Sequence, residues 1–332
     1  MTAQTAPLGT LARGPRLSPR GWRRLREISL GYALLAPAFL LLIVFEFFPV
    51  GYGLYISLCN WSLRCNQFIG LDNYTRAFAD PEMWSSLLTT VVYALVSIPL
   101  QLGLGLFLAY LLFQKVRGQD TLRVMFFFPY ITSTVASAAV WAYLYSPDRG
   151  LINAVAKVMG LPVLRWLGES RGIFALMADG AHVTLPSWAE GPPLALIALL
   201  IYTTWVYLGY DITIFLAGLG NIPTELYEAA RVDGASGWHL FRNITLPLLS
   251  PTTFFLLILT VIGTFKAFNQ IYVMTRGGPA GATETSSLYI FRQMYEFNRY
   301  GYSAALSFIL FAVILALTVA QNRFAGSRVV YD

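Results

Sequence analysis

Long apolar segments alternate with short polar ones along almost the whole chain. A helix needs about 20 mostly apolar residues to cross the roughly 30 Å hydrocarbon core of a bilayer, and six segments meet that requirement. They cover approximately residues 31–58, 86–113, 124–146, 193–219, 249–272 and 303–322. The pattern predicts an all-α membrane protein with six transmembrane helices. We expect one membrane domain over 28–325, an Arg-rich tail over 1–27 and a short tail over 326–332.

The composition supports a chain that faces lipid. Of its 332 residues, 56% are hydrophobic and 12% charged, whereas soluble domains average roughly 25% charged residues. The net charge of +6 is dispersed beside the apolar segments, so we expect membrane lipid as a partner and no nucleic acid. The two histidines, His182 and His239, lie far apart, and no Cys/His cluster has the spacing of a metal site.

The lysines exclude one class of function. They are Lys115, Lys157 and Lys266, and none follows a glycine. A phosphate-binding loop of the G-x-x-x-x-G-K-[ST] type is therefore absent, and the chain is not itself an ATPase.

The basic residues also predict an orientation. If the N-terminus lies in the cytoplasm, basic residues outnumber acidic ones in the inner segments and balance them in the outer segments. This satisfies the positive-inside rule. We expect a multi-pass protein of the bacterial cytoplasmic membrane with both termini, and the loop over 221–248, inside the cell.

The loop over 221–248 is polar and reads as two short helices joined by a turn. Pro223 suits an opening helical turn because it fixes φ and needs no hydrogen-bond donor there. Asp233 and Gly234 form the expected turn, since glycine takes a positive φ without strain. Ser236 is expected to cap the second helix, and Pro247 to interrupt the entry into the fifth span.

One motif within this loop is more specific than the rest of the chain. Glu228-Ala229-Ala230 is followed by Gly234 and then, after nine residues, by Ile244-x-Leu246-Pro247. This resembles the EAA loop of the membrane subunits of bacterial ABC importers, which docks on the ATPase subunit. The resemblance implies a type I ABC importer permease fold in which the coupling residues are Glu228, Ala229, Ala230, Asp233, Gly234, Ile244, Leu246 and Pro247.

Further segments are similar to the sugar-type (maltose and glycerol-phosphate) branch of that family. They are 68–74, 147–153, 216–223, 275–279 and 301–305, so the resemblance covers almost the whole chain. It implies a homologous second permease subunit, two ATPase subunits that carry ATP and Mg²⁺, and an extracytoplasmic sugar-binding protein. No cofactor is expected on this chain. The stretch 172–191 is longer than in minimal members, which would fit an additional contact with the binding protein.

Polar residues within the spans are candidates for a substrate pathway, because they normally face protein or water rather than lipid. Thr203, Tyr207, Tyr210 and Asp211 share one face of the fourth span, and Thr260 and Thr264 are one helical turn apart in the fifth, with Asn269 nearby. By resemblance these two spans line a central cavity. The competing interpretation is that these groups only bond to neighbouring helices, at about 0.6 kcal/mol each.

Several alternatives remain open at this stage. A glycerol-phosphate or other polar-solute ABC permease would carry the same motif, although the spans contain no arginine, which favours a neutral sugar. An ion-coupled secondary transporter would need paired intramembrane carboxylates and inverted repeats, and neither is evident. An intramembrane enzyme would need a catalytic pair, and neither histidine lies in a span. Cys59 and Cys65 form either a disulfide or two free thiols.

Overall fold

The computed structural model describes residues 19–62, 64–114, 117–179, 186, 189–324 and 326, with side chains from Glu27 onward. The chain divides into two compact units, Met1–Tyr55 and Ile56–Asp332. The expected tail over 326–332 and the first 18 residues of the expected tail over 1–27 lie almost entirely outside the described residues.

The first unit is one long helix that continues into the second unit. It consists of α1 (Pro19–Leu42), the π-helical segment η1 (Ile43–Phe47) and α2 (Phe48–Ser57). The part over Glu27–Ser57 has a mean hydropathy of 2.4, which suits a membrane span. The helix begins at Pro19, within the segment expected to be a tail.

Four long apolar helices of the second unit match predicted spans. They are α4 (Pro81–Phe113), α9 (Leu194–Gly220), α13 (Ser250–Phe265), which α14 (Asn269–Met274) extends, and α16 (Tyr300–Phe324). With the helix of the first unit and one bent helix pair, the described residues provide up to six spans. The predicted all-α membrane fold is therefore confirmed.

The third predicted span, 124–146, is not one continuous helix. It divides into α5 (Gln119–Ile131) and α6 (Thr134–Leu144), which are bent by 97° relative to each other. Pro129 lacks the N–H that would continue the helical ladder, and Thr132 adopts an extended conformation while its hydroxyl donates to the Pro129 carbonyl at 2.6 Å. The third predicted span is therefore bent, because these local bonds replace those of the helix.

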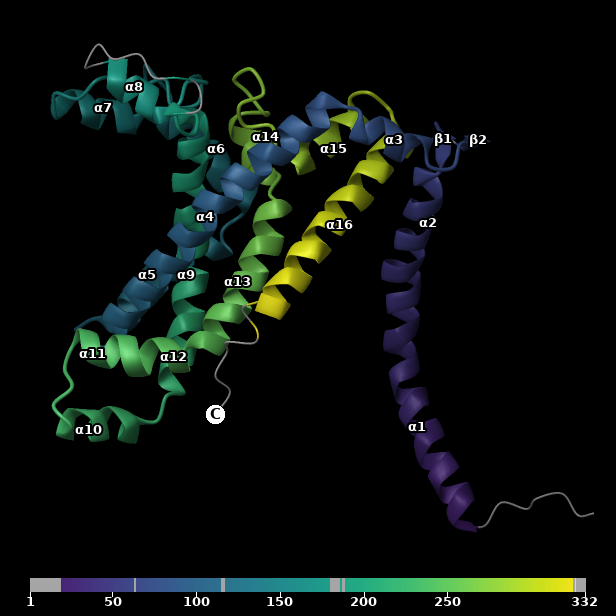
Figure 1. Cartoon of the computed structure of the whole chain (residues 1–332), viewed down its shortest axis with the longest axis horizontal. Coiled ribbons are helices and arrows are strands. Elements are labelled where there is room, and N and C mark those ends of the chain that lie inside the picture. Colours follow the sequence, from purple (N-terminus) through teal and green to yellow (C-terminus); the bar gives the residue numbers. More distant parts are fainter. Residues whose placement is uncertain are drawn as a thin grey trace, which may run out of the picture. The chain divides into compact units, whose positions relative to one another are not determined.

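Helix α9 is the centre of the second unit. It packs along α4 and α5 and also contacts α13 and α14, as Figure 1 shows. Of its most apolar stretch 67% is buried, against 22% for α16. Gly209 lies against the backbone of Phe126 with no room for a Cβ, so the glycine permits the close approach of α5 to α9. Tyr93, Leu199 and Tyr202 belong to the apolar core that results.

Smaller elements lie at the two ends of this unit (Figure 1). One end carries β1 (Cys59–Trp61) paired antiparallel with β2 (Cys65–Phe68), and the short helices α3 (Asp72–Phe78), α7 (Leu151–Val158), α8 (Ile173–Asp179) and α15 (Ser286–Tyr295). The other end carries α10 (Thr224–Val232), α11 (Trp238–Leu240), the π-helical segment η3 (Phe241–Thr245) and α12 (Leu246–Leu248).

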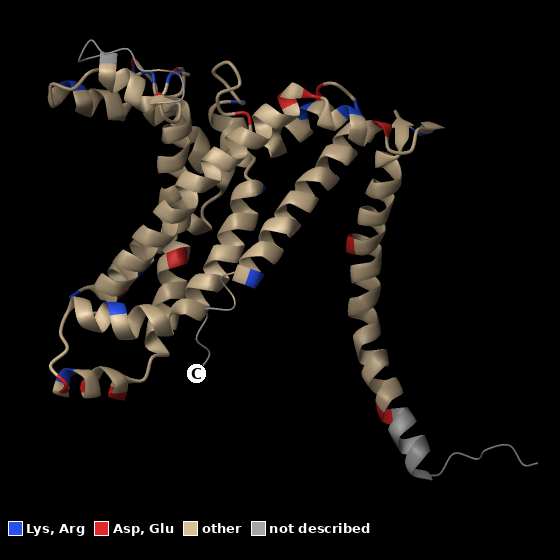
Figure 2. Cartoon of the chain, in the orientation of Figure 1, with Lys and Arg blue, Asp and Glu red and all other residues tan. Residues whose placement is uncertain are grey.

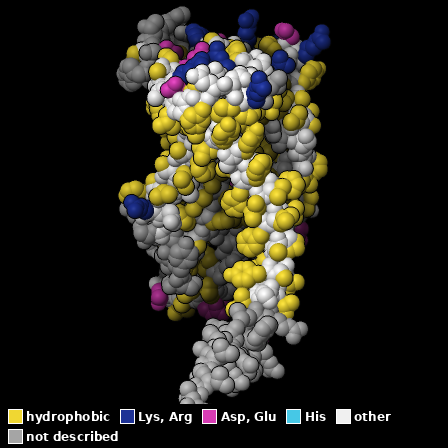
Figure 3. Space-filling model, turned by 90° about the vertical axis from the view of Figure 1, so that its right-hand side faces the viewer, with side chains coloured by type: hydrophobic (Ala, Val, Ile, Leu, Met, Phe, Trp, Pro, Cys, Tyr) yellow, Lys and Arg dark blue, Asp and Glu magenta, His cyan; other side chains and the backbone are white. Residues whose placement is uncertain are grey.

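Charged side chains follow this division. Figure 2 shows that most Lys, Arg, Asp and Glu residues of the second unit lie near its ends, with few along the spans. On the face drawn in Figure 3, hydrophobic side chains cover the spans and most of the charged ones gather at one end. This distribution places the spans in lipid and their ends in water.

The end with the β-hairpin is held by a disulfide and two polar anchors. Cys59 and Cys65 form a disulfide, and the side-chain amide of Asn73 donates to the carbonyl of Ser57 at 2.8 Å. The Asp80 carboxylate accepts hydrogen bonds from the hydroxyls of Tyr289 and Tyr302, which joins the start of α4 to α15 and α16. The question of disulfide or free thiols is thus answered in favour of the disulfide.

Candidate functional site

The loop over 221–248 forms an exposed pair of helical segments at one end of the second unit. Helix α10 begins after Pro223 and ends at Val232. Asp233 caps it, and Gly234 has a φ of +83° and allows the chain to reverse. Both features agree with the expected turn chemistry. The second helix instead begins after Gly237, and the Ser236 side chain provides no cap. The predicted cap was wrong because the positive φ of Gly237 sets the start of that helix.

The residues of the EAA motif differ in exposure. Glu228, Ala229, Asp233, Gly234 and Leu246 are exposed, whereas Ala230, Ile244 and Pro247 are half-buried. Because alanine side chains are small, no bulky group projects from α10 at Ala229 and Ala230, and another protein is able to approach the helix backbone closely. Pro247 does not stop the helical path. The chain passes from η3 through α12, which ends at Leu248, and α13 begins at Ser250.

The opposite side of the loop is attached to the bundle. Ile222, Leu240 and Leu249 are buried. The Tyr227 hydroxyl lies 3.0 Å from Oγ1 of Thr245, which joins α10 to η3. The ring of Phe241 contacts that of Tyr110 edge to face, with centroids 4.9 Å apart, which joins η3 to α4. These contacts connect α10 to η3, and η3 to the span α4.

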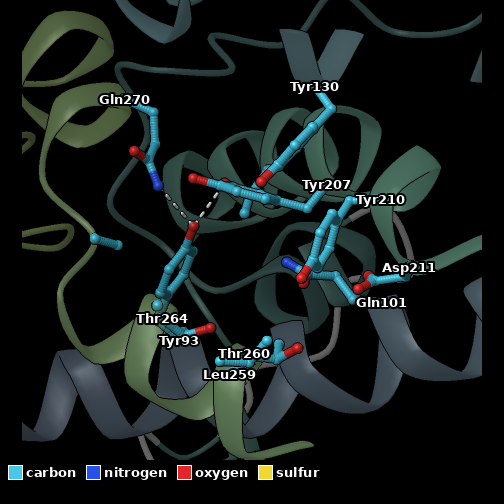
Figure 4. A pocket seen from close by; sticks show the side chains of 13 residues that line it. Tyr93, Gln101, Tyr130, Tyr207, Tyr210, Asp211, Leu259, Thr260, Thr264 and Gln270 are labelled. Carbon is cyan, nitrogen blue, oxygen red and sulfur yellow. Dashed lines mark hydrogen bonds between the residues drawn. The ribbon is translucent and has the colours of Figure 1, made fainter. Parts of the chain in front are cut away.

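A cavity of about 220 Å³ lies within the membrane bundle of the second unit (Figure 4). It is bordered by α4, α5, α9, α13 and α14. The lining combines phenols, amides, hydroxyls and one carboxylate and consists of Tyr93, Gln101, Tyr130, Thr203, Tyr207, Tyr210, Asp211, Leu259, Thr260, Gly263, Thr264, Ala267 and Gln270.

Six of the seven residues proposed for a substrate pathway lie on this cavity. They are Thr203, Tyr207, Tyr210 and Asp211 of α9, and Thr260 and Thr264 of α13. Asn269 is exposed and does not line it, whereas the neighbouring Gln270 does. The helix of the fifth span is interrupted between Phe265 and Asn269, and after this break Gln270 rather than Asn269 borders the cavity.

Four polar lining residues were not proposed from the sequence: Tyr93, Gln101, Tyr130 and Gln270. A signal for two of them exists in α4, where Tyr93, Ser97 and Gln101 recur every four residues and are buried. Polar groups at this spacing share one helical face. No such signal exists for Tyr130, which reaches the cavity from the end of α5, close to the bend.

The polar groups of the cavity are already partly ordered. The Tyr93 hydroxyl lies 2.6 Å from Oγ1 of Thr203, and the Gln270 amide donates to the same phenol at 3.5 Å (Figure 4). The rings of Tyr130 and Tyr210 stack with centroids 4.9 Å apart. Such a surface offers hydrogen-bond donors and acceptors together with aromatic faces, the combination that binds a polyhydroxylated solute.

Comparisons with known proteins identify the family of the chain. Residues 81–328 match the family described as binding-protein-dependent transport system inner membrane component. The chain is 34% identical to the trehalose/maltose transport system permease protein MalF of Thermococcus litoralis over 91% of this chain and 96% of that protein. It is 33% identical to the sn-glycerol-3-phosphate transport system permease protein UgpA of Agrobacterium fabrum, over 91% and 96%.

A solved structure shares the fold. It is a bacterial alginate ABC transporter in complex with an alginate pentasaccharide-bound periplasmic protein, and the TM-score is 0.75 at 22% identity, covering 92% of this chain and 97% of that one. The family match also covers most of the chain, from the start of α4 to beyond α16. This chain therefore belongs to the family of binding-protein-dependent transport system inner membrane components, the multi-pass permease subunits of ABC transporters.

Proposed function

We propose that this chain is half of the translocation pathway of an ATP-driven importer for a sugar or oligosaccharide. The observation that carries the substrate class is the cavity between α4, α9 and α13, where tyrosine rings alternate with hydroxyl and amide groups. Several relatives are named for trehalose/maltose or lactose transport. A glycerol-phosphate permease is the second candidate, because other relatives are named for that solute.

The cavity is small for a complete binding site. Its volume of about 220 Å³ is below the roughly 300–1,000 Å³ of most small-molecule pockets. A second, homologous permease subunit would supply the remaining wall. Two ATPase subunits would bind the EAA loops and hold ATP and Mg²⁺, and an extracytoplasmic sugar-binding protein would deliver the substrate.

The proposed orientation puts both termini and the loop over 221–248 in the cytoplasm. The charge distribution of the sequence supports it. The disulfide between Cys59 and Cys65 lies at the opposite end of the second unit, and disulfides persist in oxidising compartments outside the cytoplasm. Two independent features therefore favour the same orientation.

Coupling would proceed through the attached side of the loop. Closure of the ATPase subunits on ATP would move α10, and the Tyr227–Thr245 hydrogen bond and the Phe241–Tyr110 contact would carry this motion to α4 and α13. Because these helices border the cavity, their displacement would change the side from which it is open. ATP would thus shift the equilibrium between two conformations of the permease, although it binds to the ATPase subunits and not to this chain.

Uptake of a labelled sugar into vesicles holding the complete reconstituted complex tests this proposal. Glu228→Lys reverses a charge on the exposed face of α10, and we expect ATP-dependent uptake to collapse while the complex still assembles. Glu82→Lys makes the same charge change at the other end of the unit and should leave uptake intact. Unchanged uptake in the Glu228 variant, or uptake driven by an ion gradient without ATP, would contradict this proposal and support the secondary-transporter alternative.

A further inference from the structure

Asp211 is a buried carboxylate that the bundle does not satisfy. The residue is 2% exposed, and within the described part of the chain its Oδ2 atom has no hydrogen-bond partner. A buried polar oxygen that remains unpaired is costly, and more so when the group is charged. The side chain lines the cavity between α9 and α13. A ligand that binds in the cavity is therefore a candidate partner for this oxygen.

The position of the carboxylate is set by close packing. Helix α4 carries Gly105 opposite Asp211, and a Cβ at residue 105 would lie 2.9 Å from the Cβ of Asp211 and 3.6 Å from the ring of Phe215. The glycine therefore gives Asp211 its space. Figure 4 shows Asp211 beside Gln101, with its carboxylate among the residues that surround the cavity.

The cavity offers no positive charge to balance this carboxylate. Its lining contains no lysine and no arginine, and its other polar groups are the phenols of tyrosines, the hydroxyls of threonines and the amides of Gln101 and Gln270. In its charged form the Asp211 carboxylate would repel an anion that entered, because like charges repel strongly in surroundings of low dielectric constant. A neutral polyol would instead donate its hydroxyl hydrogens to the free oxygen.

We propose that Asp211 is a specificity-determining residue that accepts hydrogen bonds from the hydroxyls of a neutral saccharide and excludes saccharides that carry a phosphate or carboxylate group. This inference rests on the proposed function and narrows its substrate class. Specificity of this kind comes from a repulsive element as much as from new attractive contacts. It also separates the neutral-sugar function from the glycerol-phosphate alternative.

Direct binding to the complete complex, without the binding protein, tests this selection at the cavity itself. The probes are maltose, trehalose and lactose, each paired with a disaccharide of the same size in which glucuronate replaces one hexose, and saturation-transfer NMR gives the affinities. We expect the wild-type complex to bind at least one neutral member at least about tenfold more tightly than its acidic counterpart. Asp211→Asn should reduce this ratio severalfold, chiefly by improved binding of the acidic sugar.

Two further variants make the result interpretable. Asp211→Glu keeps the charge and should keep the discrimination, and Asp211→Ser replaces the Asn variant if that one does not assemble. Asp148→Asn removes the same charge from an exposed turn and should have no effect. If the Asp211→Asn complex binds neutral sugars with unchanged selectivity, or the wild type prefers the acidic member, the inference is overturned while the importer function stands. Absence of any saccharide binding by the wild type would overturn the proposed substrate class together with the inference.

Discussion

The phenol oxygen of Tyr227 lies 3.0 Å from Oγ1 of Thr245, so a side-chain hydrogen bond joins the two helical segments of the EAA loop. Tyr227 follows Leu226 on α10 and is half-buried, while its neighbour Glu228 is exposed. Helix α10 thus presents Glu228 and Ala229 outward, while the adjacent Tyr227 attaches the helix to η3.

Removal of this hydrogen bond should weaken coupling without removing the docking surface. Tyr227→Phe keeps the ring, and loss of the bond costs about 0.5–1.5 kcal/mol. We expect normal assembly and fewer sugar molecules transported per ATP hydrolysed in reconstituted vesicles. Tyr143→Phe, at an exposed tyrosine, is the matched control. An unchanged transport-to-hydrolysis ratio in the Tyr227 variant would show that this bond does not transmit the motion.

The contact between α5 and α9 depends on the absence of a side chain at Gly209. A Cβ at this position would overlap the carbonyl of Phe126, so Gly209→Ala should separate the helices and destabilise the protein by about 1–3 kcal/mol. Gly263→Ala provides the comparison, because nothing lies within 4 Å of a Cβ there and alanine is the better helix former. Thermal unfolding of the purified complexes should show a lower midpoint for the first variant alone. Equal midpoints would mean that the crossing tolerates a methyl group.

The anchor at Asp80 should make stability depend on pH in acid. Burial of the carboxylate disfavours its charge, but hydrogen bonds from Tyr289, Tyr302 and two backbone N–H groups outweigh this effect and lower the pKa of Asp80. The folded state therefore favours the charged form. Its stabilising contribution is fully present above the ordinary value of 3.8 and is lost as the pH falls through the lowered pKa of the folded state.

Asp80→Asn is the variant that tests this dependence. Hydrogen bonds to the charged acceptor are replaced by bonds to a neutral one, and we expect a loss of roughly 1–2 kcal/mol at pH 7. The difference in unfolding midpoint between wild type and variant should be largest near neutral pH and shrink below about pH 3.8. A difference that stays constant down to pH 3 would show that the carboxylate charge contributes nothing to the anchor.

The disulfide offers a direct measurement of orientation. Cys59 and Cys65 are the two cysteines of the chain, and both are in the disulfide. A membrane-impermeant maleimide should therefore leave intact cells unlabelled until an impermeant reductant is added, and should then label them from outside. Inside-out vesicles should remain unlabelled under the same treatment. Labelling in those vesicles alone would reverse the proposed topology.

Much of the fold was predictable because lipid imposes a simple rule on sequence. A segment that spans a bilayer must satisfy its backbone hydrogen bonds internally and present apolar side chains to its surroundings. Helix α9 begins at Leu194 and ends at Gly220, within one residue of the predicted bounds, for this reason. The start of α10 after Pro223 and the turn at Gly234 were likewise predictable, because proline and glycine each permit the φ that is found there.

The errors share a different cause. The bend after Pro129 depends on whether the following residues return to helical geometry, and the Thr132 hydroxyl and its extended backbone decide that they do not. The cap predicted at Ser236 failed because Gly237 has a positive φ of 45°. In each case the free-energy difference between the irregular and the regular backbone conformation is too small to predict from residue type.

The candidate cavity shows where the sequence alone reaches its limit. Periodicity within one helix grouped Thr203, Tyr207 and Asp211, because residues four apart share a face whatever the surrounding fold is. Only the packing of α4 and α5 onto α9 brings Gln101 and Tyr130 to the same space, and only the break before Asn269 turns Gln270 inward. By itself the sequence thus determined the spans, the EAA loop and one wall of the cavity, since these depend on local periodicity and residue chemistry. The tertiary structure decided the remaining walls, the disulfide and the unpaired oxygen of Asp211, because each depends on which residues distant in the chain are brought together.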